Sequence, residues 1–552
     1  MKNKNNIIVF TLAFFVFLPN LLFLILSENN IINSEIKQLA FLAFTISLIL
    51  FPLVFIRAKV YFGLMISLIP FLFFDMYFLL ITKNHSTSLY YASIFNTNMS
   101  ESKEFIVSNM AVFLTGIFGI VSYFFLWFKL DMSYRITFKN RIYILIFFLF
   151  VIGALSIKIY TLVLNNRRGK VLEGMNTTFN RNYIQRSFPF GAVYKLSKLY
   201  VIEKSLNEFN KKNKYFSYKP KILSDKNQTI LLVLGESARR QNFQLNGYDR
   251  KTNPILSKEK NLIVYKEVTT NSNFTYSSIS LILSSVNPKN FSNRLSELGI
   301  TYAFKESGFD TYWLTNQQYN EDVICKLYSS QSDYFKDVST LYDENLYDEN
   351  LLSNLKKILK DKNKKRFIVL HTMGSHFNYN KRYPKFFSKY LPDLKGSISM
   401  NKKNILKNGK EIYVNSYDNS ILYTDYILAS VIKELKKIPE NSIMLYISDH
   451  GENLYDDDKG MILHGGMNPT KYELEIPMLV WYSEGYNKEV IDNLSSYVDN
   501  KISSLVIFHT LSSLGGFQTK FHQNRFDLLS DSLQVGNRLF YIDEEKVINI
   551  DN

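Results

Sequence analysis

Three short apolar runs of the sequence end in side chains that can bind a metal ion. The runs read TILLVLGES, RFIVLHTMGSH and SIMLYISDHGE, and a fourth stretch, GMILHGG, places a histidine beside glycines. One histidine or aspartate after a strand is more often a helix cap or a loop residue, but three such runs indicate a shared site. Carboxylate and imidazole groups are zinc ligands, and the lack of cysteine in these runs disfavours a structural zinc site. The candidate ligands are Glu236, His371, His376, Asp449, His450 and His464.

The apolar runs that carry these residues, with helical stretches between them, predict an α/β domain. Short, continuously apolar runs that end abruptly in polar residues are typical of buried parallel strands. Helical stretches fall between them, such as residues 416–438. Ligands of open α/β sheets bind beyond the carboxyl ends of the strands, which is where the candidates lie. We therefore expect a catalytic domain with a mostly parallel sheet over residues 226–552.

The run TTNSNFTYSSIS at residues 269–280 offers hydroxyl groups to the same site. Runs rich in Ser and Thr usually form loops, and this run by itself indicates no more than a loop. A hydroxyl is a poor nucleophile at neutral pH, but coordination to zinc lowers its pKa. The run leads into a predicted helix, whose N-terminus would attract a phosphate. A zinc ion held by Glu236, Asp449, His450 and one of these hydroxyls would suit phosphoryl transfer through a covalent phospho-Thr or phospho-Ser intermediate.

The first third of the chain predicts a membrane domain, residues 1–164. Five apolar segments each approach the roughly 20 residues that a bilayer-spanning helix needs. A cleavable signal peptide is disfavoured for the first, because its apolar core is long and no A-x-A-like site follows. Basic residues in the short loops predict an N-terminus inside the cell and everything after residue 164 outside. The segments are residues 7–27, 39–56, 60–82, 108–128 and 142–163.

Residues 165–225 are predicted to bridge the two domains. Residues 188–212 predict an amphipathic helix, which fits either the membrane surface or the surface of the catalytic domain. Its apolar positions are Val193, Leu196, Leu199 and Tyr200.

Charge and cysteine content narrow the possible partners. The net charge of +16 fits an anionic membrane surface better than nucleic acid, because the Lys and Arg residues are scattered along the chain. The single cysteine, Cys325, excludes an intramolecular disulfide.

Taken together, the motifs resemble the phosphoethanolamine transferases, integral membrane proteins of the alkaline phosphatase and sulfatase superfamily. The matching blocks occur in family order: GESARRQNFQLNGYDRKTNP, GSHFNYNKRYP, SYDNSILYTDYIL, YISDHGENL, LHGG and IFHTLSSLGGF. The resemblance covers nearly the whole chain. It implies five transmembrane helices in the bacterial inner membrane and a periplasmic α/β/α domain of the sulfatase type. Lipid A-modifying enzymes that cause polymyxin resistance belong to this family.

By position, the resemblance implies one firmly bound zinc ion, with a second as an alternative for the working enzyme. Its ligands would be Glu236, Thr275, Asp449 and His450, with Thr275 as the nucleophile. Ser277 and Ser278 are the rival hydroxyls, because this loop is the least certain part of the alignment. The substrate-binding positions would be Thr97, Glu101, Asn316, His371, His376 and His464. For Glu101 there is also a physical reason, since its carboxylate can pair with the ethanolamine ammonium group.

The implied reaction transfers phosphoethanolamine from phosphatidylethanolamine to an acceptor in the cell envelope and releases diacylglycerol. Lipid A and a lipopolysaccharide core sugar are the expected acceptors, and the protein is expected to be a monomer without a nucleic-acid partner. Asn271 and Leu281 stand where lipid A enzymes of the family carry cysteines, which leaves the acceptor open. The alternatives are a phosphoglycerol transferase that uses phosphatidylglycerol and a catalytically silent membrane receptor on the same fold.

Overall fold

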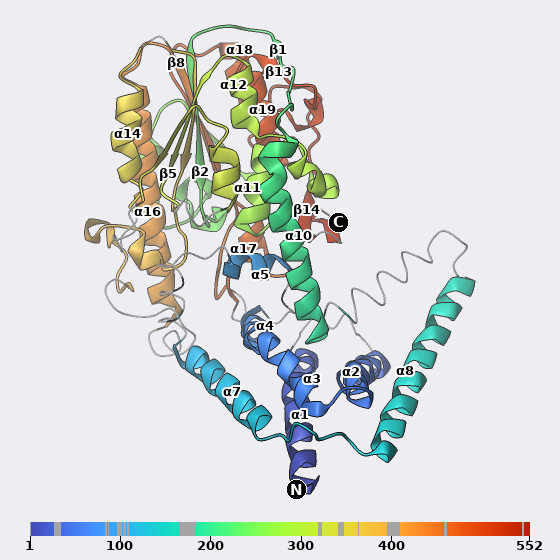
Figure 1. The fold of residues 1–552 in the computed structure, drawn as a ribbon. Helices are drawn as coiled ribbons and strands as arrows, with labels where there is room; N and C mark the ends of the chain where they lie inside the picture. The colour runs from blue at the N-terminus through green and yellow to red at the C-terminus, as the bar shows by residue number, and fades with distance from the viewer. Residues whose placement is uncertain are drawn as a thin grey trace. The chain divides into compact units, whose positions relative to one another are not determined.

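The chain divides into two compact units in a computed structural model (Figure 1). One unit contains Met1–Ile94 and Asn109–Glu203, and the other contains Phe95–Ser108 and Lys204–Asn552. The structure describes residues 2–26, 35–82, 86, 88–95, 102, 106, 110–165, 184, 186–317, 323–339, 347–362, 364–394, 409–456, 461–543 and 546–551.

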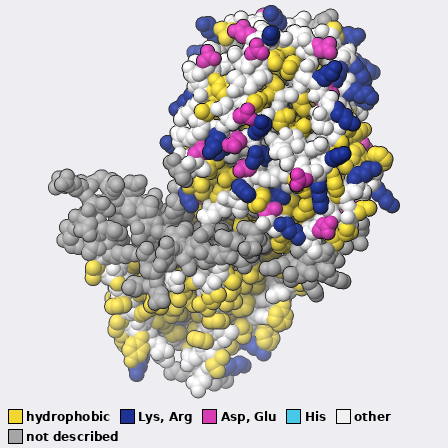
Figure 2. All heavy atoms as spheres, turned by 180° about the vertical axis from the view of Figure 1, so that it is seen from behind, with side chains coloured by type: hydrophobic (Ala, Val, Ile, Leu, Met, Phe, Trp, Pro, Cys, Tyr) yellow, Lys and Arg dark blue, Asp and Glu magenta, His cyan; other side chains and the backbone are white. Residues whose placement is uncertain are grey.

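The first unit is built from apolar helices. Four stretches in the described residues are long and apolar enough to cross a membrane: Asn3–Leu26, Ala58–Leu80, Met110–Phe128 and Phe138–Ile157. They lie in α1 (Lys2–Leu26), in α3 (Ala58–Met65) with α4 (Ile69–Thr82), in α7 (Met110–Phe128) and in α8 (Phe138–Asn165). Figure 2 shows hydrophobic side chains crowded over this unit, whereas charged side chains are spread over the other. Large exposed apolar surfaces of this kind are typical of a membrane-embedded protein.

The second of the five predicted spans is shorter than the others. A stretch of apolar residues, Gln38–Val54, occupies this place. It comprises most of α2 (Glu35–Leu50) and the 3₁₀ turn η1 (Phe51–Val54). A helix of this length is marginal for a full crossing. Five spans therefore remain a prediction.

A buried ion pair ties the predicted amphipathic helix to a membrane helix. The helix is α10 (Phe190–Lys212), and Leu199 packs in the core of the first unit while Tyr200 is exposed. Lys195 Nζ lies 3.3 Å from Asp75 Oδ1 on α4 and donates a hydrogen bond of 2.6 Å to Ser86 Oγ. A charge in so apolar a setting needs a partner of opposite sign, which explains why one basic residue of α10 points inward.

The second unit contains a seven-stranded sheet with the order β3-β11-β8-β2-β7-β5-β6. The five strands from β8 to β6 run parallel, whereas β11 is antiparallel to both neighbours. The strands are β2 (Gln228–Gly235), β3 (Leu262–Tyr265), β5 (Asp310–Thr315), β6 (Tyr334–Asp337), β7 (Arg366–His371), β8 (Asn441–Ser448) and β11 (Met478–Tyr482). The predicted mostly parallel sheet is thus confirmed, and the three predicted ligand-bearing strands are adjacent.

Helices cover both faces of this sheet (Figure 1). Successive residues of β2 alternate between two cores: Leu232 packs with one helix layer and Leu231 with the other. This alternation is expected for a strand buried on both faces. One layer contains α11 (Thr275–Leu283), α12 (Ile300–Glu306) and α19 (Val506–Leu514), and the other contains α14 (Asn350–Ile358) and α16 (Lys410–Leu435).

A buried carboxylate stabilises the turn that follows α11. Both oxygens of Glu297 accept hydrogen bonds from Ser285, one from the backbone N–H and one from Oγ, at 2.8 Å each. Burial raises the pKa of Glu297 to about 7, although the bonds from Ser285 act in the opposite direction. The folded protein therefore holds a proton here that an unfolded chain would release at lower pH.

This carboxylate should make stability depend on pH. Because its folded pKa is raised, the stabilisation is complete below pH 4.5 and is lost as the pH rises to about 7. The loss is about 3 kcal/mol for a shift of this size. Glu297→Gln keeps an oxygen that accepts the Ser285 N–H, and its amide NH₂ group can donate to Ser285 Oγ, without an ionisable proton. We expect the melting temperatures of wild type and variant to converge at pH 5 and to diverge at pH 8, with the wild type lower; parallel curves would contradict this prediction.

Candidate metal centre

The register of the sheet brings two acidic residues together. Gly235 at the end of β2 pairs with Ser448 at the end of the parallel strand β8. The next residues along each strand are Glu236 and Asp449, so both carboxylates leave the same edge of the sheet. Both side chains are fully buried, and His450 follows at once.

These three residues form a compact set of potential ligands. The Nε2 atom of His450 lies 3.1 Å from Asp449 Oδ2 and 3.6 Å from Glu236 Oε1. One ligand atom from each residue falls within 4.8 Å of the others. Two carboxylates and an imidazole at these distances match a zinc donor set that leaves a further position open.

The hydrogen bonds around these three residues leave His450 Nε2 and Asp449 Oδ2 available to bind a cation. His450 Nδ1 donates to the Gly451 carbonyl at 3.0 Å, so its Nε2 atom carries a lone pair. Asp449 Oδ1 accepts from the backbone N–H groups of Ser237 and His450, whereas Oδ2 is buried without a hydrogen-bond partner among the described residues. Two lone pairs that face each other at 3.1 Å repel unless a cation lies between them. The residues therefore fit a metal ion.

The electrostatics of the set agree with this arrangement. Burial, and next the Asp449 carboxylate, raise the pKa of Glu236 well above its ordinary value. Burial also lowers the pKa of His450 to about 4, although Asp449 opposes this effect. Two buried carboxylates without a counter-charge disfavour ionisation of both, and a neutral imidazole is the form that binds metal.

Thr275 is the first residue of α11, and its hydroxyl lies against the set. Its Oγ1 is 3.1 Å from His450 Nε2 and 3.5 Å from Glu236 Oε1. The rival hydroxyls are engaged elsewhere: Ser277 Oγ bonds to the Phe274 carbonyl, and Ser278 Oγ donates to the Asp449 carbonyl. Among these three hydroxyls, the geometry favours Thr275.

A second set of potential ligands adjoins the first. It consists of His450, Glu452 and His464. His464 Nδ1 lies 2.8 Å from Glu452 Oε2, whose other oxygen accepts a bond of 2.7 Å from the Tyr379 hydroxyl. Burial lowers the pKa of His464, but Glu452 and other carboxylates outweigh it, and the pKa lies above its ordinary value. Glu452 was not among the predicted site residues, although it lies only two positions after His450.

The remaining predicted residues differ in how close they lie to these sets. Burial, followed by Arg382, lowers the pKa of His376 well below its ordinary value, and the Arg382 guanidinium donates to the His376 carbonyl at 3.1 Å. His376 belongs to neither set of ligands within the described part of the chain. Thr97 and Glu101 lie outside the described residues.

His371 and Asn316 support the backbone beside the site. His371 is 1% exposed, and its ring packs edge-on against Trp313 with a centroid separation of 6.1 Å. Asn316 Nδ2 donates to Asp348, which in turn accepts the N–H groups of Met373 and Gly374. The structure brings neither residue into the two ligand sets. Asn316 supports, through Asp348, the turn that leads to His376, and its own N–H donates to the His371 carbonyl at 2.9 Å.

Glu473 joins the loop before Thr275 to the loop after His464. This role was not predicted from the sequence. Its Oε1 accepts bonds from Asn273 Nδ2 at 2.8 Å and from the backbone N–H of Gly465 at 2.9 Å. Its Oε2 accepts the N–H of Thr470 at 2.9 Å. No local pattern marks a glutamate that serves two distant loops. Only the T-x-x-E spacing of a capping box pointed to it.

Replacing Glu473 with glutamine should destabilise this junction. The new amide group can accept from Asn273 and Gly465 but turns its own N–H toward that of Thr470. We expect the free energy of unfolding to fall by about 1–3 kcal/mol, the usual cost of a buried donor without a partner. Thermal unfolding of Glu473→Gln beside the exposed control Glu484→Gln measures this. Equal melting temperatures would contradict the role of Glu473.

Comparison with known proteins identifies the family to which this fold belongs. The sulfatase family model matches residues 228–517, which is more than half of the chain. The chain is 32% identical over 328 residues to the phosphoethanolamine transferase EptC of Escherichia coli O18:K1:H7, and the match covers 58% of this chain and 56% of that protein. The chain thus matches little more than half of the length of this curated relative.

Two solved structures support the same assignment. The zinc complex of the periplasmic domain of Escherichia coli EptC matches with 28% identity and a TM-score of 0.54, covering 60% of this chain and 95% of that one. The integral membrane lipooligosaccharide phosphoethanolamine transferase A of Neisseria meningitidis matches with 20% identity and a TM-score of 0.75, covering 94% and 97%. The second match shows a shared fold that includes the membrane helices. The chain therefore belongs to the sulfatase family, and the relatives that it resembles within that family are phosphoethanolamine transferases.

Proposed function

We propose that the protein transfers phosphoethanolamine from phosphatidylethanolamine to a saccharide acceptor of the bacterial envelope, through a covalent intermediate on Thr275. The observation that carries this proposal is the position of Thr275 Oγ1, at the N-terminus of α11 and against a buried set of two carboxylates and an imidazole. A nucleophile, an anion-binding helix end and potential metal ligands thus meet at one point.

Zinc is the proposed cofactor. Glu236, Asp449 and His450 would hold the ion together with Thr275, and the orphaned oxygen of Asp449 is the strongest sign of such a cation. Bound zinc would lower the pKa of the Thr275 hydroxyl and supply positive charge near the phosphate. His464 and Glu452 offer ligands for a second ion in the working enzyme.

The proposed reaction has two half-reactions. In the first, the Thr275 oxygen forms a bond to the phosphorus of phosphatidylethanolamine, and the bond from phosphorus to the diacylglycerol oxygen breaks. The hydroxyl proton of Thr275 ends on the diacylglycerol that leaves. In the second, an acceptor oxygen bonds to the phosphorus, the bond to Thr275 breaks, and the acceptor proton returns to Thr275. His376 and His464 would contact the phosphoryl oxygens and stabilise their negative charge.

The proposed location is the inner membrane, with the N-terminus in the cytoplasm and the second unit in the periplasm. Both substrates are then lipids of the envelope, lipid A or a lipopolysaccharide core sugar serving as the acceptor. The four long apolar helices support this location, as do the matches to a periplasmic domain and to an integral membrane protein.

The choice between donors is tested by following diacylglycerol release. Purified protein in nanodiscs should release diacylglycerol from phosphatidylethanolamine, and much more slowly from phosphatidylglycerol at the same mole fraction. Release from phosphatidylglycerol alone would instead support the phosphoglycerol transferase. Release from neither lipid, in protein that contains zinc, would contradict both enzymes.

A further inference from the structure

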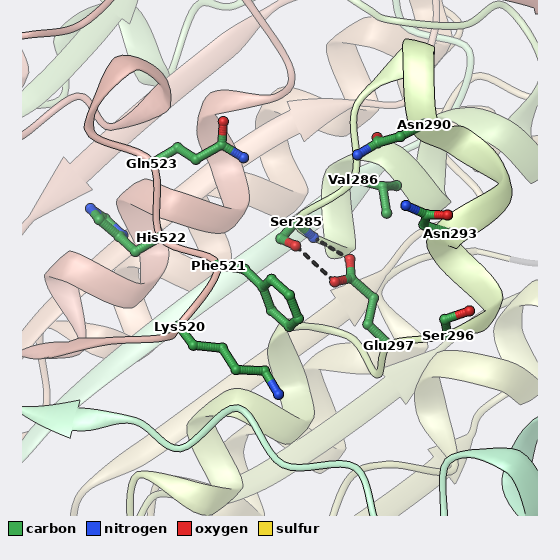
Figure 3. A pocket seen from close by; sticks show the side chains of 10 residues that line it. All are labelled: Ser285, Val286, Asn290, Asn293, Ser296, Glu297, Lys520, Phe521, His522 and Gln523. Atoms are coloured by element: carbon green, nitrogen blue, oxygen red, sulfur yellow. Dashed lines mark hydrogen bonds between the residues drawn. The ribbon is translucent and has the colours of Figure 1, made fainter.

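A polar hollow opens beside the turn after α11 (Figure 3). It has a volume of about 520 Å³ and is formed by two distant segments, residues 285–297 and 520–523. Figure 3 shows side chains from both segments around it. Those used below are Asn290, Asn293, Ser296, Lys520, Phe521 and Gln523.

Several polar groups of this hollow are free to bind a ligand. The side chains of Asn293 and Ser296 make no hydrogen bond with any residue that the structure describes. Lys520 Nζ lies 5.0 Å from the ring centres of Phe216 and Phe521. It forms no ion pair within the described ranges, although its charge acts to lower the pKa of Glu297 in the same hollow. The amide nitrogens of Asn290 and Gln523 likewise have no described acceptor. These groups converge on one space from two walls.

The walls of the hollow are fixed by other hydrogen bonds. Glu297 holds Ser285 through two bonds, both drawn in Figure 3. Asn287 and Asn290 form a reciprocal cap at the start of the 3₁₀ segment η7 (Pro288–Leu295). Arg294 is buried and donates to the Tyr276 hydroxyl at 3.0 Å. The binding groups are therefore carried on backbone that needs little ordering when a ligand arrives.

The chemistry of the lining selects among ligand classes. A metal ion is disfavoured, because both oxygens of Glu297 already accept bonds from Ser285. A fully apolar ligand would leave the amides and hydroxyl unpaired. One aromatic ring, several hydrogen-bonding groups and one ammonium group together suit a sugar ring that carries an acidic substituent.

The hollow lies at the other end of α11 from Thr275. This helix has nine residues, so its length is about 13 Å at 1.5 Å per residue. An oligosaccharide acceptor can extend over such a distance. Resting on the proposed function, we infer that the hollow binds an acidic sugar of the acceptor while another part of the same molecule reaches the phosphoryl group on Thr275.

The test measures binding of deacylated lipopolysaccharide to the full-length protein in detergent. The variant combines Asn293→Ala, Ser296→Ala and Lys520→Met, all at exposed positions of the hollow. The matched control removes the same residue types from α14, across the sheet, as Asn350→Ala, Ser353→Ala and Lys357→Met. Isothermal titration calorimetry should give a dissociation constant about tenfold higher for the hollow variant, as expected for the loss of a few hydrogen bonds. The control should equal the wild type.

A second measurement separates this inference from the proposed function. The first half-reaction with phosphatidylethanolamine needs no acceptor, so the hollow variant should release diacylglycerol at the wild-type rate while its KM for the acceptor rises. An unchanged dissociation constant in the hollow variant would overturn the inference, and an equal loss in both variants would assign binding to general charge attraction. If the wild type releases no diacylglycerol but the binding difference persists, the proposed transfer fails and the sugar site stands.

Discussion

Replacing Thr275 with alanine is expected to reduce phosphoethanolamine transfer by about 10⁴-fold or more, the scale seen when an enzyme loses its nucleophile. The methyl group of alanine fits the same position at the start of α11, so the fold and the neighbouring carboxylates should remain. What is lost is the oxygen that lies 3.1 Å from His450 Nε2. The measurement is the rate of transfer from phosphatidylethanolamine to lipopolysaccharide by purified protein in nanodiscs.

Two further variants sharpen this prediction. Thr275→Ser keeps a hydroxyl at the same place and should retain part of the activity. Ser277→Ala removes a hydroxyl that bonds to the Phe274 carbonyl, and its activity should stay close to that of the wild type. A Thr275→Ala protein that remains fully active would exclude the proposed intermediate.

Replacing Asp449 with asparagine should remove most of the metal affinity. The Oδ1 atom can still accept the N–H groups of Ser237 and His450, which hold the loop in place. At the Oδ2 position, however, an amide NH₂ group replaces the anionic oxygen that faces His450 Nε2. We expect zinc affinity to fall by more than about 100-fold, because loss of a direct ligand should exceed the 10–100-fold cost of losing a group that only supports one.

A matched variant controls for the change from aspartate to asparagine. Asp499 is exposed and pairs with Lys266 at the surface, so Asp499→Asn should leave zinc content and melting temperature unchanged. Zinc is measured by mass spectrometry after dialysis against a graded series of chelator concentrations. Equal zinc retention in Asp449→Asn and Asp499→Asn would show that Asp449 is not a ligand.

The sequence predicted the strands well because their signals are local. The run ILLVL is apolar at every position, as expected for a strand buried on both faces, and β2 ends at Gly235, directly before the charged residue Glu236. The predicted helix at residues 416–438 corresponds to α16, which begins earlier, at Lys410. Parallel neighbours then bring Glu236 and Asp449 to one edge without further information.

Contacts between distant segments could not be predicted in this way. The bond between Glu473 and Asn273 depends on the path of two loops, and the pair of Lys195 with Asp75 depends on how α10 packs on α4. Both contacts join residues that are far apart in the sequence, and neither produces a periodic sequence pattern. The end of the second predicted span was also invisible in the composition, because its apolar residues continue from α2 into the 3₁₀ turn η1.

The roles given to the lipid-contact segment remain predictions. Thr97 and Glu101 were proposed from the resemblance and lie outside the described residues, so their contribution to donor recognition awaits mutagenesis.

Peptide mass spectrometry tests most directly whether Thr275 carries phosphoethanolamine as a covalent intermediate. Full-length protein is incubated with phosphatidylethanolamine without acceptor, digested and analysed. We expect a phosphoethanolamine group on the peptide that contains Thr275, with fragment ions that place it on that residue. An adduct on Ser277 or Ser278, or no adduct in protein shown to contain zinc, would exclude Thr275 as the nucleophile.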